Sequence, residues 1–401
     1  MQTIKTFNII LPNNIIILGV KNMKILIFTC GVGIGHASRD LALAEQLKEH
    51  GHQIEFASYG SGLHYYQKNN YKPYHLPEMN FQASDGGIDV EESLKQSKDI
   101  PFTFLKSMYK EAKIVRKIKP DLILTDSDYS APIMAKFLNI PCYIITNDLT
   151  FGFSDSTNAH IVKYFEKSVS KFIIEISKGC QKILVPDIPG SIEIPEQLKN
   201  KSQFIGPLLH KDVDIIESKE KLREKYNVKQ EDTVIVVTIG GSNFGKKLLT
   251  NICEISDKIK ADKIFMFTGL EINPNSFNIP ENDEKIIIRQ FTYDLIEWMK
   301  LSDLTIAIAG HTTSMELLSI KKPNILIPLN NHVEQEKNIA RMMEYNITEK
   351  ASINNKEELL TIINNTLDNL DQIEVNKESY EDFIQYNGKE NALKLIENVD
   401  I

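Results

Sequence analysis

A glycine-rich segment that ends in a histidine, GVGIGHASRD (31–40), follows the apolar run KILIFT (24–29). Gly33 and Gly35 allow a backbone to approach a ligand closely, and a helix that starts after such a loop favours negative charge. His36 occupies the place of the third glycine of a dinucleotide-binding loop, so the match to that loop is weak. Two interpretations of His36 stay open. It is a general base at the mouth of a cleft, since imidazole titrates near neutrality, or it caps a helix.

Two aspartates, Asp126 and Asp128, come directly after a second apolar run, DLILT (121–125). A carboxylate in this position could accept a hydrogen bond from an imidazole, fix its tautomer and stabilise the imidazolium. The Asp-x-Asp spacing alternatively fits a divalent metal that holds the phosphate of a nucleotide sugar. A third interpretation is that these carboxylates cap the turn or helix that follows the strand.

A pair of glycines follows another apolar run, in the loop TIGGSNFGKK (238–247). The backbone amides of Gly240, Gly241 and Ser242 precede a helix and suit phosphate oxygens. A nucleoside-triphosphate loop of the form G-x-x-x-x-G-K-[ST] needs Ser or Thr where this chain has Lys247. The sequence therefore disfavours a kinase or an ATPase.

The loop AGHTTSMELL (309–318) carries a set of small and polar residues at the start of a helix, namely Gly310, His311, Thr312 and Thr313. These groups could surround an oxyanion, with the positive end of the helix dipole behind them. Glu316 lies one turn further along the helix, where a carboxylate can accept hydrogen bonds from the two vicinal hydroxyls of a ribose. For Thr312 taken alone, capping of the helix is the simpler interpretation.

The next loop, PLNNHVEQEKN (328–338), places Glu334 and Gln335 at another helix start. Such acceptors suit sugar hydroxyls, although a solvated helix start has a similar composition. Each of these polar loops follows an apolar run directly. The sequence thus offers a series of loops after buried strands as the places where a ligand binds.

The composition limits the class of protein. The chain has 401 residues, with 46 Lys and Arg against 54 Asp and Glu and a net charge of −8, which argues against a nucleic-acid binder. The 4 cysteines stand far apart, so neither a zinc site nor a disulfide scaffold fits and a reducing cytoplasm is expected. No apolar run approaches the ~20 residues of a membrane-spanning helix. These features predict a soluble cytoplasmic α/β protein.

Short apolar runs alternate with helical patterns from Met23 onward, which predicts parallel sheets covered by helices on both faces. We expect Met23 to be the natural start, with residues 1–22 as a loose extension. The alternation stops in a charged segment near residue 210 and then restarts, so two doubly wound domains are expected, at 23–206 and 207–378. A last helix, within 379–401, could pack back on the first domain. Open parallel sheets bind ligands beyond the carboxyl ends of their strands, where all the polar loops lie.

Taken together, these segments resemble a glycosyltransferase of the GT-B fold, in the group of the bacterial peptidoglycan N-acetylglucosaminyltransferase and the UDP-glycosyltransferases. GVGIGHASRDLALAEQL is similar to the loop and helix that open the family, and GGSNFG is similar to its G-G-S loop. AGHTTSMELLSIKKPNILIP resembles its donor-site signature, of the glycosyltransferase family 28 C-terminal type, and NNHVEQEKNI resembles its closing element. The match runs through residues 24–345 and is closest to uncharacterised archaeal members. It implies two Rossmann-like domains with the active site in the cleft between them.

The resemblance implies a role for each candidate residue. His36 matches the histidine that deprotonates the acceptor hydroxyl, and Asp126 matches the aspartate that orients this histidine. The residues that match the family's contacts with a UDP-sugar donor are Gly240, Gly241, Ser242, Gln290, Phe291, Gly310, His311, Thr312, Thr313, Glu316, Glu334 and Gln335. The residues expected on the acceptor side are Gly33, Gly35, Asp128, Asn147 and Asp148.

The acceptor element departs from the family pattern. The peptidoglycan enzyme has H-E-Q-N where this chain has TNDLTF (146–151), so its lipid substrate is not the acceptor expected here. The resemblance implies an inverting, metal-independent transfer of a hexosyl group from a UDP-sugar to a lipid or glycan-linked hydroxyl, with no cofactor required. Two alternatives stay open: a non-hydrolysing nucleotide-sugar epimerase, and a nucleotide-sugar-binding regulator without turnover.

A basic amphipathic helix is expected at 99–119, where five lysines and Arg116 are interleaved with apolar residues such as Phe102, Phe104, Leu105 and Met108. Such a helix suits the anionic inner face of the cytoplasmic membrane, which would give a peripheral contact. The alternative is a helix that packs on the sheet and leaves its basic face in solvent.

Overall fold

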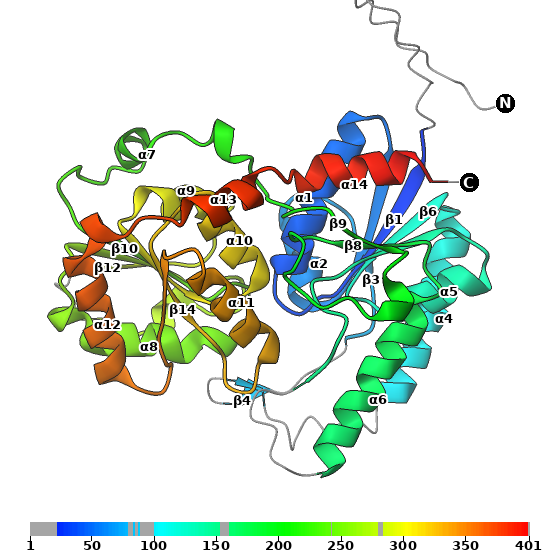
Figure 1. The fold of residues 1–401 in the computed structure, drawn as a ribbon, viewed down its shortest axis with the longest axis horizontal. Helices are drawn as coiled ribbons and strands as arrows, with labels where there is room; N and C mark the ends of the chain where they lie inside the picture. The colour runs from blue at the N-terminus through cyan, green and yellow to red at the C-terminus, as the bar shows by residue number, and fades with distance from the viewer. Residues whose placement is uncertain are drawn as a thin grey trace, which may run out of the picture.

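The computed structural model describes two α/β lobes, made of residues 22–78, 83–84, 87–88, 100–152, 160–241, 243–279 and 284–399 (Figure 1). Residues 1–21 of the expected extension, and the expected donor residue Ser242, lie outside these described residues. Among the described helices, none has both the length and the apolar character that crossing a membrane requires.

The first lobe is built on a seven-stranded parallel sheet with the order β3-β2-β1-β6-β7-β8-β9. Its strands are β1 (Lys24–Thr29), β2 (Gln53–Ser58), β3 (Tyr74–His75), β6 (Leu122–Asp126), β7 (Cys142–Ile145), β8 (Lys182–Val185) and β9 (Ser202–Phe204). The helices around it are α1 (Gly35–Glu49), α2 (Gly60–Lys68), α4 (Ile100–Ile118), α5 (Ala131–Phe137) and α6 (His160–Ser177). A short antiparallel pair is formed by β4 (Ala83–Ser84) and β5 (Gly87–Ile88).

The second lobe contains a six-stranded parallel sheet with the order β12-β11-β10-β13-β14-β15. Its strands are β10 (Val234–Thr238), β11 (Lys263–Phe267), β12 (Ile286–Arg289), β13 (Leu304–Ile308), β14 (Asn324–Ile327) and β15 (Thr348–Lys350). Its helices are α7 (Lys219–Lys225), α8 (Lys246–Ile255), α9 (Leu295–Leu301), α10 (His311–Ser319), α11 (Val333–Met343) and α12 (Lys356–Asp368). The two expected doubly wound sheets are therefore confirmed.

Successive residues of the central strands pack on opposite faces of each sheet. In β1, Ile25 and Ile27 join one apolar cluster, whereas Leu26 and Phe28 join the cluster on the other face. The residues of β10 divide in the same way between the two clusters of the second lobe. Because helices cover both faces, the central residues of these strands are apolar on both sides and form short uninterrupted apolar runs in the sequence.

The C-terminal segment crosses from the second lobe back to the first (Figure 1). It forms two helices, α13 (Lys377–Ile384) and α14 (Gly388–Glu397), because the side chain of Asn387 caps a new helix start. A Cβ on Gly388 would lie 2.3 Å from the carbonyl oxygen of Pro207, so only glycine fits where α14 meets the link between the lobes. Three residues of α14 join the core of the first lobe: Ala392, Leu393 and Ile396.

The strand order reverses once in each sheet, between β1 and β6 in the first and between β10 and β13 in the second. Neighbouring loops diverge at such a point and leave a crevice at the carboxyl ends of the strands. The polar loops of the sequence follow β1, β6, β10, β13 and β14, which border these two points or lie next to them. The fold thereby brings the loops together.

Candidate active site

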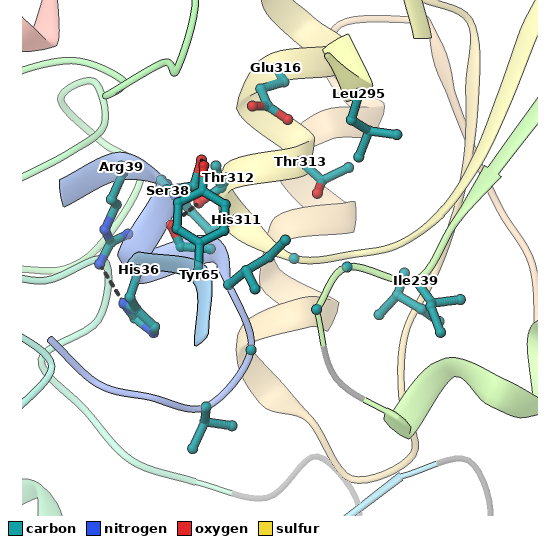
Figure 2. A pocket seen from close by; sticks show the side chains of 18 of the residues that line it. His36, Ser38, Arg39, Tyr65, Ile239, Leu295, His311, Thr312, Thr313 and Glu316 are labelled. Atoms are coloured by element: carbon teal, nitrogen blue, oxygen red, sulfur yellow. Dashed lines mark hydrogen bonds between the residues drawn. The ribbon is translucent and has the colours of Figure 1, made fainter. Parts of the chain in front are cut away.

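A cavity of about 270 Å³ lies between the two lobes at the carboxyl ends of their strands (Figure 2). The expected site residues that line it are Gly33, Gly35, His36, Asn147, Gly240, Gly241, Phe291, Gly310, His311, Thr312, Thr313, Glu316, Glu334 and Gln335. Helices α1 and α10 both begin here, with Thr312 Oγ1 only 3.3 Å from the carbonyl oxygen of Gly35. Two helix N-termini thus face one space, which favours an anion.

His36 lies in the first turn of α1 and pairs with Asp126 at the end of β6. The distance from His36 Nδ1 to Asp126 Oδ1 is 2.8 Å. Since a carboxylate is only an acceptor, Nδ1–H donates and Nε2 keeps its lone pair. The imidazole is 25% exposed and the carboxylate is fully buried. The geometry therefore offers a base that a ligand can reach, oriented by a carboxylate that it cannot.

Arg39, which the sequence reasoning missed, holds the same carboxylate from the next turn of α1. Its Nε and NH2 groups donate to the two oxygens of Asp126, each at 2.5 Å. NH2 also lies 3.0 Å from His36 Nδ1 (Figure 2). Burial opposes ionisation of Asp126, but the guanidinium of Arg39 and the hydrogen bonds from Arg39 and His36 hold its pKa well below the ordinary value. Asp126 is therefore an anion at neutral pH.

The acceptor-side residue Asn147 connects this cluster to the other lobe. Its Oδ1 accepts a hydrogen bond from Arg39 NH1 at 3.1 Å, and its Nδ2 donates to Glu334 Oε1 at 2.8 Å. Burial raises the pKa of Glu334, but its electrostatic interactions, those with His332 and His311 foremost, outweigh burial and lower this pKa. Glu334 thus lies where it can also meet a ligand, since it lines the cavity.

The glycine loop after β10 approaches the first lobe closely. Gly240 has a φ of +74°, a conformation that side chains rarely adopt. A Cβ on Gly241 would lie 2.4 Å from Ile34 Cγ2, in the loop before α1. Gly310 caps α10 and borders open space at the cavity. Glycine at these positions keeps backbone amides accessible to a phosphate.

One end of the cavity is aromatic and carries the carboxylate of Glu316. Tyr65 and Phe291 meet edge to face with ring centroids 6.0 Å apart, and Phe291 meets Tyr293 at 4.9 Å. Burial raises the pKa of Glu316 to about 7. An apolar wall beside a carboxylate that accepts hydrogen bonds is the environment that a nucleoside needs.

Besides the buried Asp126, three expected residues that the structure describes do not line the cavity. Asp128 Oδ1 accepts hydrogen bonds from Ser130 N at 3.0 Å and from Ser130 Oγ at 2.9 Å, as a cap of α5. Asp148 pairs with Lys337 at 3.0 Å, and Gln290 donates to the carbonyl oxygen of Leu270 at 3.4 Å. Within the described ranges, no group of three or more His, Cys, Asp and Glu side chains is arranged to hold a metal ion.

Several polar residues of the cavity wall were not among the expected site residues. Besides Arg39 they are Ser38, Tyr65, His210, Thr292, Tyr293 and His332. Arg39 had a detectable signal, because it stands three residues after His36 and so shares its face of the helix. His210 reaches the cavity from the segment that links the lobes, and only the folded chain reveals this.

Two family models match the chain, one on each lobe. The glycosyltransferase family 28 C-terminal domain matches residues 234–396, and glycosyl transferase family 1 matches residues 23–234. An uncharacterised glycosyltransferase of Methanosarcina mazei is 30% identical over 331 residues, which cover 80% of this chain and 84% of the relative.

A more distant relative has a named reaction. The UDP-N-acetylglucosamine–N-acetylmuramyl-(pentapeptide) pyrophosphoryl-undecaprenol N-acetylglucosamine transferase of Clostridium perfringens is 27% identical, with 90% of this chain and 93% of the relative covered. Among solved structures, MurG of Acinetobacter baumannii has a TM-score of 0.59 at 16% identity, over 94% of this chain and 100% of that one. The spinosyn rhamnosyltransferase SpnG has a TM-score of 0.63 at 11% identity, with the same coverage. These two similarities establish the fold.

Proposed function

The chain belongs to the GT-B glycosyltransferases with a family 28 C-terminal domain, and from this premise we propose that it moves a hexosyl group from a UDP-sugar to a hydroxyl of a lipid or glycan-linked acceptor. The observation that carries this proposal is the His36–Asp126 pair on one wall of a cavity whose other wall is built from glycine loops and a helix start. The relative that uses UDP-N-acetylglucosamine supports the choice of donor.

The acceptor hydroxyl is activated by His36. Its Nε2 takes the hydroxyl proton while the acceptor oxygen forms a bond to the anomeric carbon of the donor. The bond from this carbon to the UDP oxygen breaks, and UDP leaves with the electron pair. Asp126 stabilises the imidazolium that forms. Because one displacement occurs, the anomeric configuration is inverted.

The leaving diphosphate is held by fixed donors of the second lobe. The amides near Gly240 and Gly241, the start of α10 and the His311 imidazole supply them without a metal ion. Glu316 accepts hydrogen bonds from the ribose hydroxyls, and the backbone near Gln290 and Phe291 contacts uracil. Thr312 and Thr313 complete the diphosphate site, while Glu334 and Gln335 contact the sugar.

A peripheral membrane contact through α4 belongs to the same proposal. Phe102, Leu105 and Tyr109 are 73%, 64% and 64% exposed, whereas the opposite face of this helix is buried. Lys113 lies over the Tyr109 ring at 4.4 Å, so cationic and aromatic groups share the exposed face. Amphipathic helices of this kind bind anionic lipid surfaces.

Flotation with vesicles tests the membrane contact. We expect the chain to float with vesicles that contain anionic phosphatidylglycerol and not with phosphatidylcholine alone, and the triple variant F102S/L105S/Y109S to float less. Equal behaviour with both vesicles would remove this part of the proposal and leave the reaction untouched.

Thermal unfolding in the presence of nucleotides tests the donor site. UDP at 100 times its Kd should stabilise the folded chain by about 2.7 kcal/mol, because it binds only the folded state. GDP, TDP, ADP and NAD should have smaller effects, and magnesium should not change the ranking. Stabilisation by NAD alone would assign the loop at 31–35 to a dinucleotide and overturn the UDP proposal.

A further inference from the structure

A second buried aspartate pairs with an imidazole on the donor side of the cavity. Asp187, 2% exposed, follows β8 in the first lobe, and its Oδ2 lies 3.0 Å from His311 Nε2. Arg341, at the end of α11, donates to the same oxygen. Since His311 and Arg341 lie on helices of the second lobe, this cluster spans the two lobes.

The other ring nitrogen of His311, Nδ1, has no hydrogen-bond partner in the described part of the chain. Nδ1 is buried, although His311 lines the cavity. A buried polar atom without a partner destabilises a fold by about 1–3 kcal/mol, so such an atom is expected to meet a ligand. Because Asp187 occupies Nε2, only Nδ1 is left for that contact.

The charge of Asp187 determines how the ring is held. Burial opposes its ionisation, but the contacts with His311 and Arg341 lower its pKa below the ordinary value. An ionised carboxylate is an acceptor only, so Nε2–H of His311 donates to it and both the tautomer and the ring orientation are fixed.

We propose that Asp187 is a positioning residue for the leaving group. It accepts a hydrogen bond from Nε2–H of His311 and stabilises the imidazolium, so that Nδ1, which takes up a proton from solvent when the donor binds, donates to the diphosphate. This inference rests on the proposed function, because it takes the donor to be a UDP-sugar. A residue of the first lobe thereby completes a diphosphate site whose other groups come from the second lobe.

Comparison of UDP with uridine tests this inference, because uridine lacks the diphosphate. We expect Asp187→Asn to weaken UDP binding roughly 10- to 100-fold, the range for a hydrogen bond between charged groups, while uridine binding stays unchanged in calorimetric titrations. Asp212→Asn is the matched control. It removes a carboxylate that pairs with Lys389 at 2.7 Å, is half exposed and does not line the cavity, so both affinities should stay at the wild-type values.

The outcomes separate this inference from the proposed function. Failure of the wild-type chain to bind UDP would contradict the proposed donor. Wild-type UDP binding with an unchanged UDP affinity in Asp187→Asn, or an equal loss for UDP and uridine, would overturn the role of Asp187 alone. If Asp187→Asn does not fold, long-range ¹H–¹⁵N spectra of the wild-type chain decide the matter. We expect a proton on Nε2 of His311 in the free protein, and a neutral ring protonated on Nδ1 would overturn the inference.

Discussion

Asp126 and Asp187 each bind an imidazole and an arginine, but Asp126 engages its arginine with both oxygens and Asp187 with one. Arg39 donates to both Asp126 oxygens, whereas Arg341 and His311 share Oδ2 of Asp187. The imidazoles are also held by different atoms, through Nδ1 at Asp126 and through Nε2 at Asp187.

The two clusters also differ in where their members come from. The Asp126 cluster belongs entirely to β6 and α1 of the first lobe, so the orientation of His36 does not depend on how the lobes sit. The Asp187 cluster joins the end of β8 to helices α10 and α11 of the second lobe. If the Asp187 cluster holds the leaving group as proposed, this site is complete only when the two lobes are closed, and closure would keep water away from the donor.

The largest expected effect is on the rate of transfer, and it distinguishes the role of His36 from that of His311. His36→Ala should lower transfer roughly 10²- to 10⁴-fold, the usual contribution of a general base, while UDP affinity stays unchanged. UDP release from the most active UDP-sugar, together with calorimetric titration of UDP, measures both quantities. His50→Ala is the matched control, because His50 pairs with Glu397 away from the cavity. Near wild-type transfer in His36→Ala would show that His36 is not the base.

The second effect concerns stability and compares the two arginines. Arg39→Met leaves a buried carboxylate with one partner fewer and should lower the free energy of unfolding by about 3–5 kcal/mol. Arg341→Met should lower it by only about 1–3 kcal/mol, because Arg341 is 15% exposed and its NH2 has no hydrogen-bond partner among the described residues.

Urea unfolding at pH 7 measures both arginine variants. The pKa of Asp126 lies below its unfolded value, so the contribution of this pair is present above about pH 4 and lost as the pH falls further. Similar losses for the two variants would contradict the claim that Asp126 is held more firmly than Asp187.

A third prediction contrasts the titration of the two sides. The pKa of Glu316 is raised to about 7, whereas Asp126 remains ionised. If ribose hydroxyls donate to ionised Glu316, uridine binding below pH 7 requires Glu316 to lose its proton. The affinity for uridine should therefore fall about tenfold for each pH unit below 7. Above that pH the affinity should be constant. In Glu316→Gln the affinity should be weaker and independent of pH, and an unchanged slope would assign the titration to another group.

The fold was predictable because each central strand is buried on both faces and so reads as an apolar run. The same runs located the loops of His36, Gly240, His311 and Glu334, since a ligand site of a parallel sheet follows its strands. Local sequence patterns were therefore enough to predict the architecture and the loops that form most of the cavity wall.

Contacts between distant segments were not predictable in this way. Asp187 stands in VPDIPG, which has no motif, and His311 lies 124 positions further along the chain. Arg39 was visible in GHASRD, but its role required knowing that α1 faces the end of β6. Asn147 lies in the segment that departs from the family pattern, and its bond to Glu334 exists only because the two lobes meet. Such pairings depend on tertiary geometry, which no local pattern encodes.

The smallest expected effect is the energetic coupling between the Asp126 cluster in the first lobe and Glu334 in the second. Asn147 joins Arg39 of the Asp126 cluster to Glu334 of the second lobe through single hydrogen bonds, each with a contribution of about 0.5–1.5 kcal/mol. A double-mutant cycle of Asn147→Ala and Glu334→Ala in urea unfolding should give a coupling energy of about 1 kcal/mol. A coupling near zero would mean that Asn147 does not link the two lobes energetically, so that the proposed base and the proposed sugar site are independent. A coupling of the expected size would make Asn147 the group through which contacts of the sugar with Glu334 reach the arginine that holds Asp126.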